Sequence, residues 1–463
     1  MRILIGNQID PAVRDRRDLR AWTQRVLWFA MDDDLVVLCA EPDPQFLQYA
    51  TTLTGVNPTS LHIMIAPAGR HDGLLLDPES LVSPAFLHAV AAALDTCGAG
   101  WVSEVFALWP SPAVSRFATA LGIENRFPGA AFFAQGGGEL GNNKATFRAL
   151  AAGADVPIPS GAVCRDANEA ATATADLLAG SGSVVVKQAH NGAGVGNQLV
   201  VRDSPLSLDH VGARHLHWLA DGPDGIEAYW AERWDWASAG GRHPVVIEEF
   251  VPHSKSVFSE HYVASDRTWP TEMGTLFYVR RRLSHQTVPL RDLDAPARAQ
   301  LLGGGTRLAE TYRSLGFRGN LSADAIVTPD GRVVFTEVNA QVSGSLHIYD
   351  VIARRIVDVA ATPERSVIEY HVPPTWAVPD LDIFLAATDQ LGCAYDPDTR
   401  TGVIVSMPLI PLEAGKAQFV FCICYAHDVD RQQVWDQLDA QFAVEPASTY
   451  SASDHVGVSS RPS

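Results

Sequence analysis

Two acidic side chains and one amide flank a predicted turn and have the chemistry of a metal site. Asp324 and Glu337 lie on either side of Asp330-Gly331, in the segment SADAIVTPDGRVVFTEVN. A two-residue turn places Asp324 directly opposite Glu337, and a four-residue loop makes them diagonal neighbours on one face. A three-residue loop with a bulge puts them on opposite faces. Asn339 shares the face of Glu337 in any register.

Carboxylates that face one another across a sheet repel unless a cation lies between them. Two carboxylates and an amide are hard oxygen ligands, which suit Mg²⁺ bound together with nucleotide phosphates. The alternative is a solvated hairpin whose acids point to water. We interpret Asp324, Glu337 and Asn339 together as a magnesium site.

A glycine-rich segment between two apolar runs predicts a phosphate-binding hairpin. In VVVKQAHNGAGVGNQLVV, Lys187 ends a β-branched run, and Gly192, Gly194 and Gly196 follow it. Glycine lets the backbone approach a ligand closely and adopt φ > 0, so that N–H groups can face phosphate oxygens. Taken alone, the segment is equally compatible with an ordinary glycine-rich hairpin.

A third segment, VVIEEFV, predicts a strand that ends in Glu248, Glu249, Phe250 and Val251. A nucleotide base could lie against such a strand end, with main-chain groups recognising its edge.

The elements around these segments predict a mixture of α/β and α+β structure. Short apolar runs alternate with helical stretches in the first part of the chain, which predicts an α/β domain without the dinucleotide-binding G-x-G-x-x-G. A glycine-rich break then precedes an α+β region with antiparallel hairpins, and prolines mark a further boundary. The predicted strands there are 183–187, 245–250, 257–263, 275–280, 322–327, 333–339, 402–407 and 418–425; those before the break are 2–5, 35–39, 61–65 and 101–108. The predicted helices are 15–31, 142–152, 166–178, 348–359 and 431–442, the break is 135–141, and the tail from Pro446 is expected to be loose.

Composition restricts the class of protein. The chain has 463 residues with 53 acidic and 35 basic side chains, a net charge of −18, so nucleic acid is an improbable partner. No apolar run reaches the ~20 residues of a membrane span, and the start lacks a signal-peptide core. We expect a cytoplasmic protein with reduced cysteines and no membrane partner; a homodimer is the commonest default.

In order along the chain, these residues resemble the ATP-grasp superfamily: a lysine at a helix start (Lys144), Lys187 with its glycine loop, the Glu-Glu-Phe-Val segment, and an Asp…Glu-x-Asn set. The arrangement is most similar to that of pheganomycin-type peptide ligases. The resemblance implies a pre-ATP-grasp α/β domain (1–140), an ATP-grasp nucleotide-binding core (141–365) and a small α+β C-terminal domain (366–463).

The resemblance also implies roles for individual residues. Asp324, Glu337 and Asn339 would bind Mg²⁺, and Glu248 would accept a hydrogen bond from the adenine amino group. The backbone of Phe250 and Val251 would recognise the adenine edge. ATP phosphates would be held by Lys144 and Lys187 and covered by a loop that contains Asn191, Gly192, Gly194, Gly196 and Asn197, where His190 could also donate.

Three positions depart from the family pattern. The usual ribose-binding acid is Lys255 here, and Ser322 and Gln341 replace two common arginines. The oxyanion donor would then come from Arg280 or Arg282, which strand alternation places on one face with Arg281 on the other, or from backbone N–H groups around Ser343.

The implied function is an ATP-dependent ligase that joins a small-molecule carboxylic acid to an amine, an amino acid or a peptide, through an acyl phosphate. Peptide or natural-product biosynthesis is the expected setting. The alternatives are an ATP-binding regulatory module without turnover and a phosphotransferase whose phosphorylated product is stable.

Overall fold

The computed structural model describes residues 1–7, 18–96, 102–192, 194–202, 212–220, 222–411 and 417–444. The first residues of the predicted helix 15–31, the start of the predicted strand 101–108, Cys97, and the tail from Pro446 lie outside these ranges. The remaining five cysteines are buried and free, as expected for reduced thiols. Within the described part of the chain, no helix has both the length and the apolar character needed to cross a membrane.

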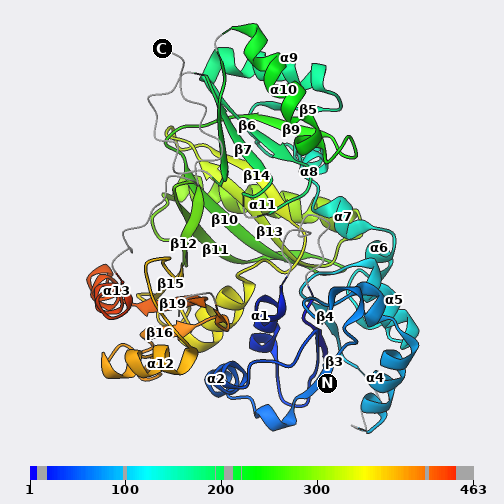
Figure 1. The fold of residues 1–463 in the computed structure, drawn as a ribbon, viewed down its shortest axis with the longest axis vertical. Coiled ribbons are helices and arrows are strands. Elements are labelled where there is room, and N and C mark those ends of the chain that lie inside the picture. Colours follow the sequence, from blue (N-terminus) through cyan, green and yellow to red (C-terminus); the bar gives the residue numbers. More distant parts are fainter. Residues whose placement is uncertain are drawn as a thin grey trace.

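The N-terminal region is a parallel four-stranded sheet with helices around it (Figure 1). Its strand order is β3-β2-β1-β4, with β1 (Ile3–Ile5), β2 (Leu35–Leu38), β3 (His62–Ile65) and β4 (Val105–Ala107). The four predicted strands are confirmed. The main helices are α1 (Arg20–Thr23), η2 (Gln24–Phe29), α2 (Pro44–Thr54), α3 (Pro78–Leu81), α4 (Pro84–Thr96) and α5 (Pro112–Ala120). The helix expected over 15–31 is therefore a short α-turn that continues as a 3₁₀-helix.

The predicted glycine-rich break at 135–141 is wrong, because most of it is helical. Helices α6 (Ala130–Ala134), α7 (Gly137–Gly141) and α8 (Lys144–Gly153) follow one another. A Cβ atom on Gly138 would lie 2.9 Å from the carbonyl oxygen of Pro110, and one on Gly141 would lie 2.9 Å from Cβ of Ala340. These glycines are there for close packing of α7 rather than for a loose linker.

A five-stranded sheet, β5-β9-β6-β7-β8, forms the top of the molecule in Figure 1. Its strands are β5 (Gly161–Cys164), β6 (Ser183–Gln188), β7 (Asn197–Val201), β8 (His215–Trp218) and β9 (Val245–Glu249). Helices α9 (Ala167–Ser181) and α10 (Pro223–Ser238) pack on it, and Trp230 is buried between them, where its Nε1 donates to Oγ1 of Thr174 (3.0 Å).

An eight-stranded antiparallel sheet occupies the centre, in the order β14-β13-β10-β11-β12-β15-β19-β16. Helix α11 packs on one of its faces, and the π-helix η6 follows β14. The strands are β10 (Lys255–Val263), β11 (Thr268–Val279), β12 (Arg282–Val288), β13 (Gly319–Val327), β14 (Val333–Asn339), β15 (Ser366–His371), β16 (Gly402–Val405) and β19 (Val420–Tyr425). The other elements are α11 (Ala295–Ser314), η6 (Ile348–Val357), α12 (Leu381–Gln390), β17 (Ile410–Pro411), β18 (Ala417–Gln418) and α13 (Asp428–Phe442).

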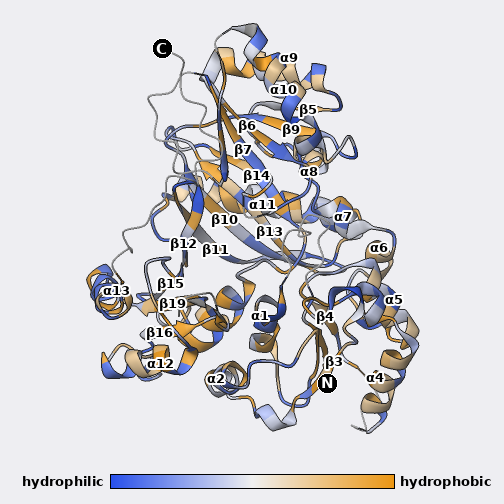
Figure 2. Ribbon diagram, viewed as in Figure 1, coloured by the Kyte–Doolittle hydropathy of each residue, from blue (hydrophilic) through white to orange (hydrophobic). Residues whose placement is uncertain are grey.

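The C-terminal strands β15, β16 and β19 extend the central sheet, because β15 pairs directly with β12, whereas β17 and β18 pair with each other in a separate two-stranded sheet. Figure 2 shows β16 and β19 as hydrophobic, in agreement with the full burial of Ile404 and Phe421. One buried cluster joins Val36 of the N-terminal sheet to Val367 and Ile423. The core is therefore continuous across both predicted boundaries, and the division at 140 and 365 stays a proposal.

Candidate functional site

The hairpin β13–β14 brings the predicted metal ligands together. Asp324 pairs directly with Glu337, and Ser322 pairs with Asn339, so all three predicted ligands share one face. The predicted pairing is confirmed, although the turn differs from the two-residue form. Thr328 and Arg332 close a three-residue loop, and a bulge then shifts the register between Asp324 and Ala325. The bulge restores the pairing that the loop alone would have lost.

The donor set fits Mg²⁺. Asn339 Nδ2 lies 3.2 Å from Asp324 Oδ2, which gives two carboxylates and an amide in one cluster. Burial raises the pKa of Asp324 to about 8, and the charges of Glu337 and Glu260 add to the effect. Without a cation these carboxylates oppose one another, which is the electrostatic condition of a site built for a positive ion.

Lys144 reaches this cluster from α8. The helix begins there because the Asn143 side chain accepts from the backbone N–H groups of Ala145 (2.9 Å) and Thr146 (3.1 Å). The buried Lys144 Nζ lies 2.9 Å from Glu337 Oε1 and donates to the backbone oxygen of Asn191 (2.5 Å). The ammonium group of Lys144 therefore connects the start of α8 with the glycine loop and with β14, which carries Glu337 and Asn339.

Lys187 approaches the same strand from β6. Its Nζ donates to the carbonyl oxygen of Thr336 (3.1 Å), which is the residue that the bulge leaves unpaired. Lys187 also forms an ion pair with Glu248, and Arg148 Nη1 contacts the other oxygen of that carboxylate (2.7 Å). Glu248 is buried and holds two cations, so the structure gives it a role in positioning Lys187. Its predicted bond to adenine remains a prediction.

The predicted adenine-binding segment follows β9 directly. The backbone N–H of Phe250 donates to the carbonyl oxygen of Ser183 (3.3 Å), which holds the end of β9 against β6. The carbonyl oxygen of Val251 accepts from Ser254 Oγ (3.0 Å). Contacts of this backbone with a base stay a prediction.

The glycine segment forms the predicted hairpin tip between β6 and β7. Gly194 has φ +70°, and a Cβ atom there would lie 2.6 Å from the carbonyl oxygen of Gly212. A Cβ atom on Gly196 would lie 2.6 Å from Cβ of Asn191, whereas one on Gly192 would meet no atom of the described part of the chain within 4 Å. Asn197 Nδ2 donates to the carbonyl oxygen of Gly212 (2.9 Å) and so fixes the end of the glycine segment that leads into β7. Two of the three glycines are thus required by close contacts.

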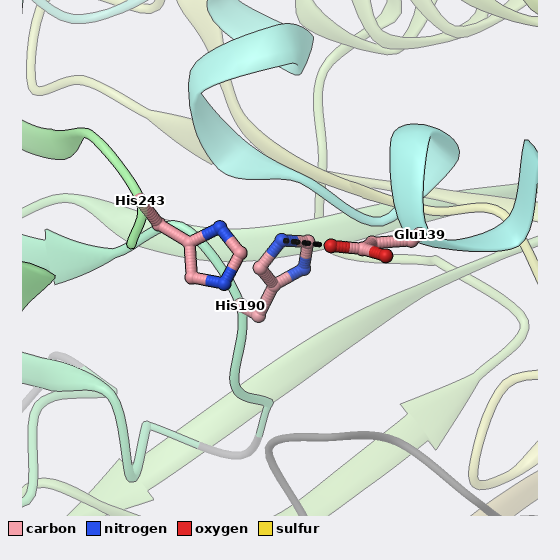
Figure 3. Close-up of side chains that lie close together, drawn as sticks. All are labelled: Glu139, His190 and His243. Carbon is pink, nitrogen blue, oxygen red and sulfur yellow. Dashed lines mark ion pairs between the residues drawn. The ribbon is translucent and has the colours of Figure 1, made fainter. Parts of the chain in front are cut away.

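His190 lies at the start of this tip, between Glu139 and His243 (Figure 3). Its ring contacts His243 edge to face, with centroids 4.6 Å apart, and its Nε2 is 3.1 Å from Asn143 Nδ2 and 3.8 Å from Glu139 Oε1. Burial lowers the pKa of His190 to about 4, and the charges of His243 and Lys144 lower it further. His190 is therefore neutral near pH 7 and connects α7 to the glycine segment.

The strand alternation predicted for Arg280, Arg281 and Arg282 is wrong. Val279 pairs with Arg282, so Arg280 and Arg281 form the two-residue turn between β11 and β12. Both have positive φ, 48° and 64°, as a tight hairpin turn requires. Strand alternation does not apply to turn residues, so Arg280 and Arg282 do not share a strand face. Their part in catalysis stays a prediction.

Sequence reasoning missed several charged residues near the site. Arg148 lies one helical turn after Lys144, a spacing that could have shown that both face the same way. Glu260 and Glu369 are acids in the interior of strands β10 and β15, at buried positions that the sequence alone does not mark. Burial raises the pKa of Glu260 to about 7 and that of Glu369 to about 8.

A pocket of 1430 Å³ lies beside α7 and the start of α8. Phe127, Leu140 and Tyr262 line it, and Glu139 and Asn143 border it next to His190. None of the residues predicted to bind ATP or Mg²⁺ lines this pocket. It therefore lies next to the cluster of lysines and carboxylates and does not contain it.

Comparison with known proteins agrees with the fold. Residues 23–123 match the family model described as the Pre ATP-grasp domain. No curated protein sequence matches the chain. An N5-carboxyaminoimidazole ribonucleotide synthetase solved with ADP has a TM-score of 0.55 and 13% identity, over 94% of this chain and 97% of that chain.

Two further structures are similar. A biotin carboxylase from Campylobacter jejuni has a TM-score of 0.56 and 12% identity, over 94% of this chain and 91% of that chain. An L-amino acid ligase from Bacillus licheniformis has a TM-score of 0.53 and 13% identity, over 96% of this chain and 98% of that chain. The expected fold class is confirmed: the chain has an ATP-grasp fold that begins with a pre-ATP-grasp domain.

Proposed function

We propose that the protein is an ATP-dependent carboxylate–amine ligase that forms an amide or peptide bond, in peptide or natural-product biosynthesis. The observation that carries the proposal is the meeting of Asp324, Glu337 and Asn339 on one face, with Lys144 contacting Glu337 and Lys187 contacting the bulge next to it. Nucleotide-bound structures of similar fold support it. In this proposal ATP is a substrate and Mg²⁺ is the cofactor.

Mg²⁺ bound at the three ligands would neutralise phosphate charge as the γ-phosphoryl group is transferred. Lys144 and Lys187 would turn from their carboxylate partners to the phosphates. An oxygen of the acid substrate attacks the γ-phosphorus, the bond to the β-phosphate oxygen breaks, and ADP leaves. The amine nitrogen then attacks the acyl carbon of the acyl phosphate, the carbon–oxygen bond breaks, and phosphate leaves while the nitrogen loses its proton.

The chain's remaining residues would bind and cover the substrates. The glycine loop, which includes Gly194 and Gly196, would lay its backbone N–H groups over the phosphates. The backbone at Phe250 and Val251 would recognise adenine, and Glu248 would keep Lys187 in place. Arg280, Arg282 or backbone N–H groups near Ser343 would stabilise the tetrahedral oxyanion.

The proposal is tested by assaying ADP and phosphate with Mg²⁺, ATP and a panel of carboxylic acids and amines. We expect ADP only when an acid and an amine are both present, together with an amide detected by mass spectrometry. Tight ATP binding without ADP from any combination would instead favour a regulatory module. A persistent phosphorylated compound without amide would favour a phosphotransferase.

A further inference from the structure

A row of polar side chains crosses the central sheet next to the proposed metal site. Asn339 pairs with Ser322, Ser322 pairs with Glu260, and Glu260 pairs with Glu272. Directly opposite residues in antiparallel strands point to the same face, so these four side chains share the face of Asp324. These side chains therefore extend from the proposed metal site across the neighbouring strands β10 and β11.

Glu260 stands out in this row because its carboxylate has no partner among the residues that the structure describes. The residue is 1% exposed, and neither carboxylate oxygen accepts a hydrogen bond of normal geometry from these residues. The hydroxyls of Ser322 and Ser343 lie close enough to lower the pKa of this carboxyl group, but burial raises it by more. Buried carboxylates without partners are costly, so one that is kept beside a reaction centre points to a ligand that supplies the missing donors.

The neighbouring acids are satisfied by the protein itself. Glu272 Oε1 accepts from the backbone N–H of Met273 (2.9 Å) and lies near the charge of Arg354. Glu369 Oε2 accepts from Ser345 Oγ (3.0 Å). Glu337 has Lys144. Glu260 is therefore distinguished from each of them by its vacant oxygens.

Resting on the proposed function, we propose that Glu260 binds the cationic nitrogen of the amine substrate. A protonated amine carries the charge and the N–H donors that a buried carboxylate needs. Glu260 and Asp324 are diagonal neighbours on adjacent strands, roughly 7–8 Å apart by sheet geometry. An amine held by Glu260 would thus lie beside an acyl phosphate held at the metal. Once its ammonium group has passed a proton to the Glu260 carboxylate, the neutral nitrogen can attack the acyl carbon.

The substrate class follows from this geometry. The amine substrate carries a positively charged primary or secondary amino group, and neutral nitrogen donors such as amides and N-acetylated amines are excluded. Ser343 lies next to Glu260, and Gly344 lies against Trp22 of α1, so the segment after β14 covers the carboxylate. Entry of the amine therefore requires this segment to move aside.

The test measures amine binding by calorimetry, with Mg²⁺ and a non-hydrolysable ATP analogue present. The probes are the standard amino acids, their methyl esters and dipeptides, each compared with its N-acetyl counterpart. We expect at least one free amine to bind the wild-type protein, its N-acetyl form to fail, and Glu260→Gln to weaken binding about tenfold or more. Binding of the ATP analogue should stay unchanged in that variant, which shows that it is folded.

Glu272→Gln is the matched control, since it removes the opposite carboxylate of the same row. It should keep amine binding within about twofold, because Glu272 already has a partner in the protein. The inference is overturned if no free amine binds or if Glu260→Gln binds amines normally. It is also overturned if that variant changes only the Mg²⁺ concentration needed for binding of the ATP analogue. Failure of the ligase proposal is distinguishable, because amines would then bind through Glu260 without any ADP being formed.

Discussion

Lys144 Nζ lies 2.9 Å from Glu337 Oε1, so a lysine on the first turn of α8 compensates a carboxylate of the proposed metal site. This pair joins the end of the N-terminal region to the central sheet. A cation is thus already present where charge compensation is needed, and it is the side chain proposed to hold phosphate. Binding of Mg²⁺ and ATP would replace this contact by two new ones, metal to carboxylate and lysine to phosphate.

Replacing Asp324 should separate catalysis from folding. Asp324→Asn removes a buried carboxyl group whose ionised form is opposed by Glu337 and Glu260, so the metal-free variant should melt at the same temperature as wild type or higher. ADP release should fall by about a hundredfold or more, because one metal ligand is lost. Asp330→Asn, on the exposed turn of the same hairpin, should leave both quantities unchanged. Strong destabilisation by Asp324→Asn would contradict a metal-binding role.

Glu248 should be important for stability as well as for ATP binding. Glu248→Gln leaves the buried Arg148 and Lys187 without their shared partner, which should lower the free energy of unfolding by about 3–5 kcal/mol. Urea unfolding measures this loss. The adjacent Glu249→Gln should cost less than about 1 kcal/mol, because Glu249 is only half-buried and bonds to one backbone N–H. Equal effects of the two variants would show that the buried ion pairs do not hold Lys187.

The buried acid Glu369 should make stability depend on pH. Burial raises its pKa to about 8, so the folded state binds this proton more tightly than the unfolded chain does. Stability should therefore fall as the pH rises from about 6.5 to 8, and the fall should be shallower in Glu369→Gln. Histidines whose pKa is lowered, such as His285 at about 4, change the pH dependence of stability only below this window. Urea unfolding at several pH values in this window measures the slope of the free energy of unfolding against pH. An equal slope in wild type and Glu369→Gln would contradict the raised pKa of Glu369.

The three glycines of the loop should differ in importance. Gly194→Ala places a Cβ atom at positive φ and 2.6 Å from the carbonyl oxygen of Gly212, so the loop must distort. We expect binding of an ATP analogue to weaken by about fivefold or more, which corresponds to ~1 kcal/mol of strain. Gly192→Ala meets no atom of the described residues within 4 Å and should bind the analogue normally. Similar affinities of the two variants for the ATP analogue would show that the loop does not take part in ATP binding.

The sequence alone predicts those strands whose apolar runs are short, β-branched and bounded by turns, but it misses β5, β8, β12 and β15. The sequence also predicts that Asp324 and Glu337 face each other. Their pairing, however, depends on a bulge at Thr336 that the residue types do not predict. The helix α7 is missed, because glycines that allow close packing look the same in sequence as glycines that break a helix. The turn at Arg280 and Arg281 is missed because arginine is not a turn signal.

Residues that act through tertiary contacts are beyond sequence reasoning. Arg148 and Glu248 are 100 residues apart, and only the fold shows that they share Lys187 as a neighbour. The same holds for Glu260, whose vacant oxygens become visible only when the burial and partners of every side chain on that face are known.

The most direct measurement follows oxygen from the acid substrate. The acid identified in the assay is labelled with ¹⁸O in its carboxylate and incubated with ATP, Mg²⁺ and the amine. An acyl phosphate route predicts that one labelled oxygen appears in the released inorganic phosphate, in equal amount to the ADP and the amide formed. Amide formation with unlabelled phosphate, or with AMP as the nucleotide product, would contradict the mechanism proposed for the Asp324, Glu337 and Asn339 site.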